Sequence, residues 1–139
     1  MSTPSATLPR AALLLFSGIL AVGLAACAPS GDASPGGGET VTVANGAVEI
    51  SADDLAFNAG VIEATAGEPF TVTLVNNESQ PHNFAVYTEE GGDVIVQGEI
   101  ITGPDQSTPV EVPALEAGEY FFVCDVHATE MTGTIVVSG

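Results

Sequence analysis

Residues of the kinds that bind soft metal ions occur at a distinctive spacing near the C-terminus of this 139-residue chain. Cys124, His127 and Met131 form a Cys-x2-His-x3-Met pattern, and His82 lies well before them in the sequence. Two imidazoles, one thiolate and one thioether are the donor set of a trigonal copper site with a weak axial sulfur. The thiolate binds Cu(I) and donates strongly to Cu(II), and imidazole suits both states. The pattern therefore predicts a mononuclear site for one Cu(I)/Cu(II) ion per chain.

Each of these residues has a more ordinary interpretation when it is taken alone. A single Cys at a strand end is commonly a small buried hydrophobe, and a Met commonly fills a gap in the core. A His at the head of a strand commonly makes structural hydrogen bonds. The whole chain has only two His, two Cys and two Met. The pattern would have to take up by chance both His, one of the two Cys and the only Met besides Met1, so we favour the metal site.

Other chemistries fit these residues less well. A structural zinc site requires four Cys or His ligands, and this region offers three. A binuclear copper centre would need a second Cys in the loop, and a multicopper oxidase would need many more His. Nucleophilic catalysis by Cys124 with His127 has no evident oxyanion donor or substrate cleft to support it. We therefore expect that the chain is not an enzyme.

The elements that must hold these residues are predicted to be β-strands. Between residues 41 and 139 the apolar residues alternate with period two, β-branched residues recur, and no sustained helical stripe is present. Predicted strands cover residues 41–43, 47–50, 70–74, 119–124 and 132–137, and His82, Phe84 and Val86 share one face of a further strand. Turn signals rich in Gly, Pro, Asn and Asp separate these runs. The pattern predicts an all-β sandwich or barrel.

Taken together, the strands, the turns and the metal-binding pattern resemble the cupredoxins, small blue copper proteins such as plastocyanin, pseudoazurin and amicyanin. The resemblance covers about residues 47–139. It rests on the segments 66–69, 76–84, 118–120 and 124–131 and on Gly133-Thr134. Membership of that family implies a Greek-key β-sandwich of eight strands with copper buried at one end.

The resemblance also implies a role for each residue of the site. His82, Cys124 and His127 would be the equatorial copper ligands, and Met131 would be the axial ligand. The side chain of Asn83 would bond the backbone near Cys124 and tie the two ligand segments together. The edge of His127 would reach solvent and serve as the electron port. The loop from His127 to Met131 is one residue shorter than in plastocyanin and one longer than in amicyanin.

Two functions of different classes follow for a domain of this kind. The first is single-electron transfer between redox partners. The alternative is a copper-binding or copper-handling module that stores or delivers the ion without shuttling electrons. The sequence has no Met-rich or His-rich stretch of the kind that passes copper along, so we favour electron transfer.

The N-terminal segment reads as an export signal followed by a tether. Residues 11–26 carry no charge and are shorter than the roughly 20 residues that span a bilayer. They end in Leu24-Ala25-Ala26-Cys27, which resembles the lipobox of bacterial lipoproteins. We predict a signal peptide at 1–26, lipidation of Cys27, a flexible tether through residue 40 and the copper domain at 41–139. An uncleaved anchor and ordinary cleavage with a free Cys27 are the alternatives, and both also place the domain outside the cytoplasm.

The charge balance restricts the possible partners. The chain has 18 Asp and Glu against a single basic residue, Arg10, and its formal net charge is −17. A domain without Lys or Arg cannot neutralise phosphates, which excludes nucleic acid as a partner. The acidity has two interpretations: attraction of a basic redox partner such as a cytochrome or an oxidase domain, or the general surface chemistry of a salty habitat. We expect a monomer, attached to the membrane through its lipid anchor.

Overall fold

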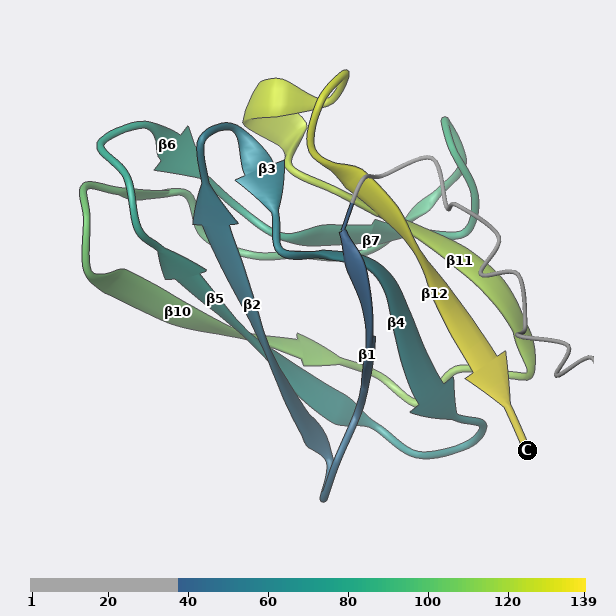
Figure 1. Cartoon of the computed structure of the whole chain (residues 1–139). Coiled ribbons are helices and arrows are strands. Elements are labelled where there is room, and N and C mark those ends of the chain that lie inside the picture. The colour runs from purple at the N-terminus through teal and green to yellow at the C-terminus, as the bar shows by residue number, and fades with distance from the viewer. Residues whose placement is uncertain (1–37) are drawn as a thin grey trace, which may run out of the picture. The chain divides into compact units, whose positions relative to one another are not determined.

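The computed structural model describes residues 38–139, which form strands and one short 3₁₀ helix (Figure 1). The predicted signal peptide, Cys27 and most of the predicted tether lie outside the described residues. The elements, in chain order, are β1 (Glu39–Thr42), β2 (Ala47–Asp53), β3 (Ala56–Phe57), β4 (Ala59–Thr65), β5 (Phe70–Asn76), β6 (Pro81–His82), β7 (Ala85–Tyr87), β8 (Val94–Gln97), β9 (Ile101–Thr102), β10 (Gln106–Val112), β11 (Gly118–Val123), η1 (Asp125–His127) and β12 (Thr132–Ser138).

The strands form two main sheets that pack face to face. One sheet has the order β1-β4-β12-β11-β7-β8, and the other has the order β10-β5-β2-β3. A short pair, β6 and β9, stands apart from them. The chain passes between the sheets repeatedly, so strands adjacent in sequence often belong to different sheets. The all-β sandwich expected from the sequence is confirmed.

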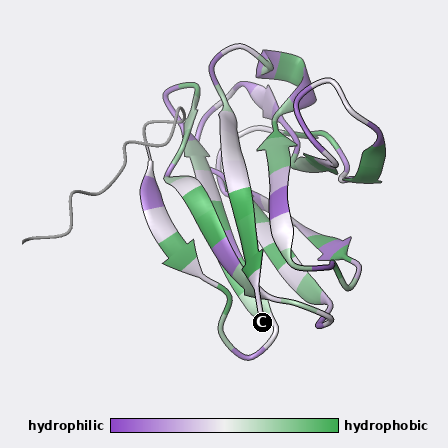
Figure 2. Cartoon of the chain, turned by 90° about the vertical axis from the view of Figure 1, so that its right-hand side faces the viewer, coloured by the Kyte–Doolittle hydropathy of each residue, from purple (hydrophilic) through white to green (hydrophobic). Residues whose placement is uncertain are grey.

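The core lies between the two sheets and is built by period-two alternation. In β5 every second residue from Phe70 to Asn76 is buried, and β12 alternates in the same way. Figure 2 shows the resulting change from hydrophobic to hydrophilic along the strands. Because successive side chains of a strand point to opposite faces, this pattern places one face of each strand against the opposing sheet.

Three phenylalanines form the part of the core that lies around β11. The rings of Phe84 and Phe122 stack at a centroid distance of 5.1 Å, and Phe57 packs on both from β3. Gly133 faces Phe122 across the β11–β12 ladder. A Cβ atom on Gly133 would overlap the Phe122 ring, so the close approach of β12 requires glycine there. The strand that leads to Cys124 is therefore packed rigidly.

The structure corrects some details of the strand predictions. Asn45 and Gly46 do form a turn with positive φ, but β1 and β2 on either side of it belong to different sheets. β1 begins at Glu39, so two residues assigned to the tether pair with β4 instead. The strand predicted from His82 to Val86 is interrupted between β6 and β7, although His82, Phe84 and Val86 are all fully buried.

β10 is a strand that the sequence analysis did not predict, and it contains Pro109. Proline cannot donate a backbone hydrogen bond, which confines it to sheet edges. β10 is the edge strand of its sheet, beside β5. The Pro109 nitrogen can therefore face away from the ladder without leaving a bond unmade.

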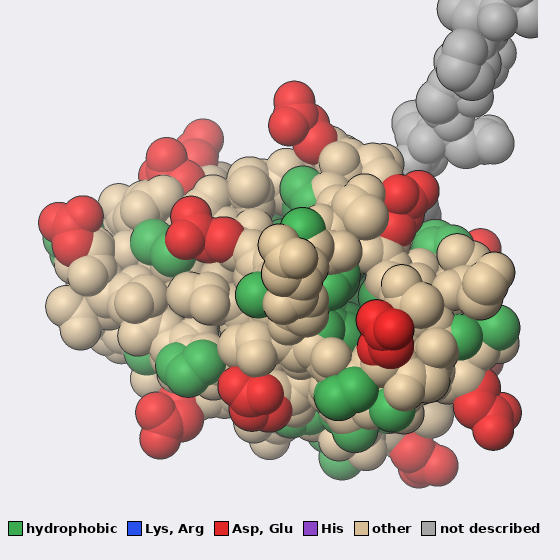
Figure 3. All heavy atoms as spheres, turned by 90° about the horizontal axis from the view of Figure 1, so that it is seen from below, with side chains coloured by type: hydrophobic (Ala, Val, Ile, Leu, Met, Phe, Trp, Pro, Cys, Tyr) green, Lys and Arg blue, Asp and Glu red, His purple; other side chains and the backbone are tan. Residues whose placement is uncertain are grey.

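Acidic side chains do not gather in one place on the face of the domain seen from below. Figure 3 shows them scattered across the face seen from below, with no Lys or Arg among them. Within residues 38–139 no helix has the length and apolar character needed to cross a membrane.

Candidate metal centre

One end of the sandwich brings together three of the four predicted ligands. His82 ends β6, Cys124 directly follows β11, and His127 ends η1. β6 and η1 are in contact, and both lie at the end of the molecule opposite the C-terminus (Figure 1). The donor atoms of His82, Cys124 and His127 all lie within 4.8 Å of one another. Residues far apart in the sequence thus meet at one point, as the pattern requires.

The two sulfur–nitrogen distances fit a trigonal metal site. Cys124 Sγ lies 3.7 Å from His82 Nδ1 and 3.8 Å from His127 Nδ1. Metal bonds are about 2.3 Å to a thiolate sulfur and about 2.0 Å to an imidazole nitrogen, as in zinc sites. Bonds of that length from one ion could reach Cys124 Sγ and each of the two nitrogens at these separations. Two imidazoles and a thiolate are the equatorial set of a type 1 copper site, so the donor set fits a single copper ion.

The three donor residues differ in how far they are buried. His82 and Cys124 are fully buried, whereas His127 is half-buried. The centroids of the His82 and His127 imidazole rings lie 4.9 Å apart, and the angle between the ring planes is 49°. The partial exposure of His127 agrees with the expectation that its edge reaches solvent. His127 is therefore the most exposed of the three donors.

Met131 is held next to Cys124 and His127 by its backbone. Its carbonyl accepts a hydrogen bond from the Cys124 N–H at 2.9 Å, and its own N–H donates to the His127 carbonyl at 3.0 Å. The His127 N–H in turn donates to the Cys124 carbonyl. The Met131 side chain is buried in the core. These bonds close the ligand loop into a compact turn, and axial ligation by Met131 stays a prediction.

Substitution of Met131 by Leu should keep the blue colour and raise the reduction potential. Leucine has a similar volume but removes a weak sulfur donor that helps Cu(II). We expect a rise of about 59 mV or more, which is tenfold in the ratio of reduced to oxidised protein for a one-electron couple. Voltammetry of the copper-loaded variant measures the shift. An unchanged potential would mean that Met131 is not a ligand.

The second nitrogen of His82 is fixed by a carboxylate that the sequence analysis did not identify. Glu78 Oε1 lies 2.9 Å from His82 Nε2 and also accepts the backbone N–H of Leu55 at 2.9 Å. A carboxylate accepts but does not donate, so the ring proton resides on Nε2 and Nδ1 keeps its lone pair for a metal. The Leu55 N–H, and the His82 ring with it, hold the pKa of Glu78 below its ordinary value, although burial acts in the opposite direction.

Asn83 makes the contact that the resemblance implied. Its Oδ1 accepts the backbone N–H of Asp125 at 2.8 Å, directly after Cys124. Its Nδ2 donates to Asp125 Oδ2 at 2.7 Å. These two bonds join the His82 segment to the Cys124 segment. Whether Asn83 contributes to copper binding stays a prediction.

The carboxylate of Asp125 is the centre of a larger hydrogen-bond network. Besides Asn83, it accepts Gln97 Nε2 and the Tyr87 hydroxyl, each at 2.7 Å. Burial alone would raise the pKa of Asp125, but the donors Asn83, Gln97 and Tyr87 outweigh it and the pKa is lowered. The same bond to Asp125, assisted by burial, raises the pKa of Tyr87. Within residues 38–139 no buried side-chain nitrogen or oxygen lacks a partner.

The phenol of Tyr87 should ionise above the ordinary tyrosine pKa of about 10. The Asp125 carboxylate accepts from the neutral phenol, so it favours the protonated form. The bond therefore contributes stability that is fully present below about pH 10 and is lost as the pH rises through the folded-state pKa. An ultraviolet titration in a Tyr120→Phe background isolates this phenol. We expect the further change Asp125→Asn to return the pKa of Tyr87 towards 10. A Tyr87 pKa at or below 10 in the protein that keeps Asp125 would contradict a hydrogen bond between the two side chains.

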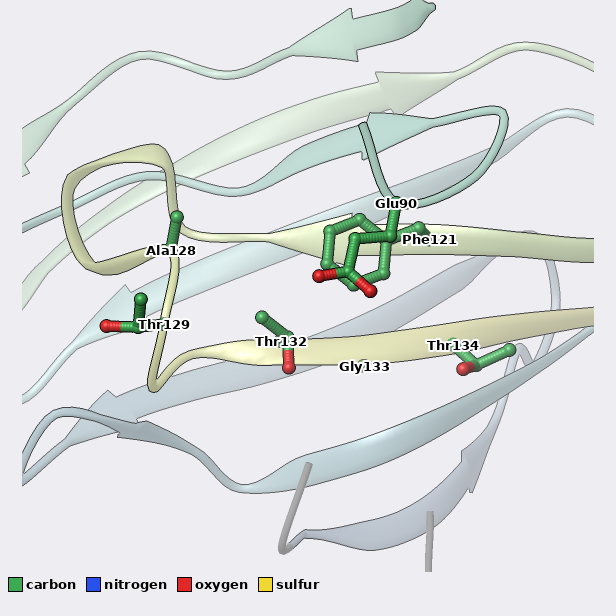
Figure 4. Close-up of a pocket in the computed structure, with 7 residues that line it drawn as sticks. All are labelled: Glu90, Phe121, Ala128, Thr129, Thr132, Gly133 and Thr134. Atoms are coloured by element: carbon green, nitrogen blue, oxygen red, sulfur yellow. The ribbon is translucent and has the colours of Figure 1, made fainter. Parts of the chain in front are cut away.

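An open pocket of about 500 Å³ lies beside the ligand loop and not at the site. Figure 4 shows Ala128 and Thr129 on that loop, with Thr132 and Thr134 on the strand that follows it. The pocket is lined by Glu90, Phe121, Ala128, Thr129, Thr132, Gly133 and Thr134. None of the four candidate ligands lines it, so it has no part in metal binding.

Comparison with known proteins agrees with this fold. The cupredoxin-like domain profile matches residues 17–137. Auracyanin A, a "blue" copper protein from the green thermophilic photosynthetic bacterium Chloroflexus aurantiacus, is 22% identical with a TM-score of 0.58, covering 69% of this chain and 98% of its own. Dithionite-reduced auracyanin from Roseiflexus castenholzii is 22% identical with a TM-score of 0.61, covering 70% and 100%.

A reduced amicyanin variant is 26% identical with a TM-score of 0.50, covering 68% of this chain and 85% of its own. Because the two auracyanins are only 22% identical to this chain, their similarity supports the fold alone. No curated protein sequence matches the chain.

Proposed function

The chain belongs to the cupredoxin-like domain family, and from this premise we propose that it transfers single electrons between redox partners. His82, Cys124 and His127 would hold one copper ion, with Met131 as the axial ligand. The ion supplies the Cu(I)/Cu(II) couple when it is bound. The protein would act as a carrier and not as an enzyme.

The convergence of Cys124 Sγ with the Nδ1 atoms of His82 and His127 is the observation that carries this proposal. A thiolate with two imidazoles in a trigonal arrangement suits both oxidation states of copper. The donors come from separate segments that Asn83 and the backbone bonds of Met131 tie together. Such a rigid frame limits how far the ligands can move when the charge of the site changes. We infer that the residues favour fast electron exchange over release of the ion.

His127 is the proposed electron port. It is half-buried, whereas His82 and Cys124 are fully buried. Val126, immediately before it, is an exposed apolar residue. A partner that contacts this surface would approach the site through the imidazole edge of His127.

We propose that the domain works outside the cytoplasm, attached to the bacterial cell membrane through a lipid on Cys27. The support is the apolar run that ends in Leu24-Ala25-Ala26-Cys27. Acyl chains on a lipidated N-terminal Cys would give stable anchoring. A Cys27→Ser variant should move from the membrane fraction to the soluble fraction. If it stays with the membrane, an uncleaved anchor is the better explanation.

A basic protein, such as a cytochrome or an oxidase domain, is the proposed redox partner. Residues 38–139 contain no Lys or Arg, so the domain attracts positive surfaces over its whole extent. The acidic side chains are scattered, however, which is also what a salty habitat would produce (Figure 3). Electron-transfer rates with a basic cytochrome should fall as ionic strength rises. A flat profile would remove electrostatic steering and leave habitat as the reason for the acidity.

Repeated redox cycling of the copper-loaded chain separates electron transfer from copper handling. An electron carrier should bleach on reduction, recover its colour on oxidation and keep its copper through many cycles. A module that stores or delivers copper should lose the ion when its oxidation state changes. Copper content measured after each cycle decides between the two functions.

A further inference from the structure

Asp125 is a charged residue directly beside Cys124, the proposed thiolate ligand. It is not one of the four predicted ligands. It is half-buried and immediately follows Cys124. Both of its carboxylate oxygens are occupied. Oδ2 accepts Asn83 Nδ2 and Gln97 Nε2, and Oδ1 accepts the Tyr87 hydroxyl, all at 2.7 Å. Three side chains therefore hold one carboxylate in a single orientation.

The three donors come from different segments around the site. Tyr87 ends β7, Gln97 ends β8, and Asn83 follows His82. β7 pairs with β11, the strand that leads to Cys124, and β8 pairs with β7. The carboxylate thus links the edge of the six-stranded sheet to the start of the ligand loop. Rotation of the loop about Cys124 would break bonds to all three segments.

The backbone anchor of the loop does not by itself require a carboxylate. The Asp125 N–H already donates to Asn83 Oδ1, and any residue except proline at position 125 could make that bond. What aspartate adds is a negative charge, held by three neutral donors. Residues 38–139 include no Lys or Arg that could neutralise it. A charge that is fixed, partly buried and without a cationic partner acts on its neighbours with little screening.

We propose that Asp125 is a positioning residue of the metal centre, which orients Cys124 and whose negative charge lowers the reduction potential of the bound copper. The inference rests on the proposed function. A negative charge close to the site favours Cu(II), the more positive ion, over Cu(I).

Asp125→Asn is the direct test, because it removes the charge and keeps the size of the side chain. At a fixed ambient potential we expect the ratio of reduced to oxidised protein to rise about tenfold, which corresponds to about 59 mV. The visible band should persist, since the ligands are unchanged. Asp125→Glu keeps the charge and should restore most of the original potential.

Two controls separate charge from general loosening of the loop. Glu119→Gln removes an equally negative but exposed carboxylate from β11, and we expect a change of less than about twofold because solvent screens it. Tyr87→Phe and Gln97→Leu each remove a donor and leave the Asp125 charge less compensated. Both should therefore lower the potential, in the direction opposite to Asp125→Asn. Loosening alone would shift all three variants in the same direction.

The experiment is voltammetry of the copper-loaded chain and its variants, with the visible spectrum recorded for each. A reversible couple in the unmodified chain must be seen first, and its absence would count against the proposed function. With that couple present, the reduction potential of Asp125→Asn decides the matter. If it is unchanged, or shifts no more than that of Glu119→Gln, the proposed role of the Asp125 charge is overturned while the proposed function stands. If Asp125→Asn does not fold, a raised or constant potential in Tyr87→Phe and Gln97→Leu overturns it equally.

Discussion

Replacing Cys124 with Ser is expected to abolish the visible absorption of the Cu(II) protein completely. The colour of such a site arises from charge transfer between a thiolate and Cu(II). Cys124 is the only cysteine within residues 38–139, and its sulfur lies next to both imidazoles. A serine hydroxyl is a hard and mostly protonated donor, so it can replace neither the electron donation nor the softness of sulfur.

The second cysteine of the chain provides a matched control. Cys27→Ser should leave the visible band at full intensity, because Cys27 belongs to the predicted lipobox and not to the metal motif. Circular dichroism of both variants should show the β-sheet signal of the unmodified chain. A band that survives in Cys124→Ser, or that disappears in Cys27→Ser, would contradict the assignment of Cys124 as the thiolate ligand.

Replacing His82 with Ala is expected to weaken copper binding by more than about 100-fold. Loss of a residue that only supports a ligand costs 10- to 100-fold in metal affinity, and His82 is proposed as a ligand itself. Its Nδ1 faces Cys124 Sγ, while its Nε2 is held by Glu78. Alanine would remove the donor and leave the Glu78 carboxylate facing the empty space. Competition with a chelator of known copper affinity measures the loss.

Two further measurements make the His82 result interpretable. Added imidazole should partly restore copper binding to His82→Ala, because it can enter the space that the ring leaves. Glu78→Gln keeps the ring and should cost less affinity than His82→Ala. Unchanged copper affinity in His82→Ala would exclude His82 from the metal site, and a larger loss in Glu78→Gln would make the carboxylate the ligand instead.

The sequence pattern was sufficient to predict the residues that meet at the site. The spacing Cys-x2-His-x3-Met requires only that the chain turn back on itself after a strand, and η1 with its backbone bonds makes that turn. His82 could be added because its type is scarce in this chain. Asn83 could be added because the resemblance assigns it a bond near Cys124, and the structure contains a bond of that kind.

The supporting carboxylates could not be predicted, because they depend on contacts between distant elements. Glu78 contacts His82 only because the chain leaves β5 through a turn, in which Asn76 Oδ1 accepts the Glu78 N–H. Asp125 reaches Tyr87 and Gln97 only because β7 and β8 form the edge of the larger sheet. Neither residue has a sequence signal beyond being acidic, and 18 residues in this chain are acidic.

Which strands pair with one another could not be predicted from local sequence patterns either. Asn45-Gly46 is a hairpin signal, yet the strands beside it belong to different sheets, because β1 pairs with β4 and β2 with β5. The break between β6 and β7 was also hidden, since buried residues continue across it. In both places the packing of the two sheets overrides the local preference. Because the strand is interrupted, β6 and its last residue, His82, lie against η1.

Stepwise addition of Cu(II) to the purified metal-free chain, followed by visible absorption, tests the central claim most directly. Coordination by His82, Cys124 and His127 predicts an intense blue colour that grows with each addition and saturates at one copper ion per chain. A solution that stays colourless with Cu(II) bound, or a band that needs more than one ion per chain, would contradict a type 1 copper site.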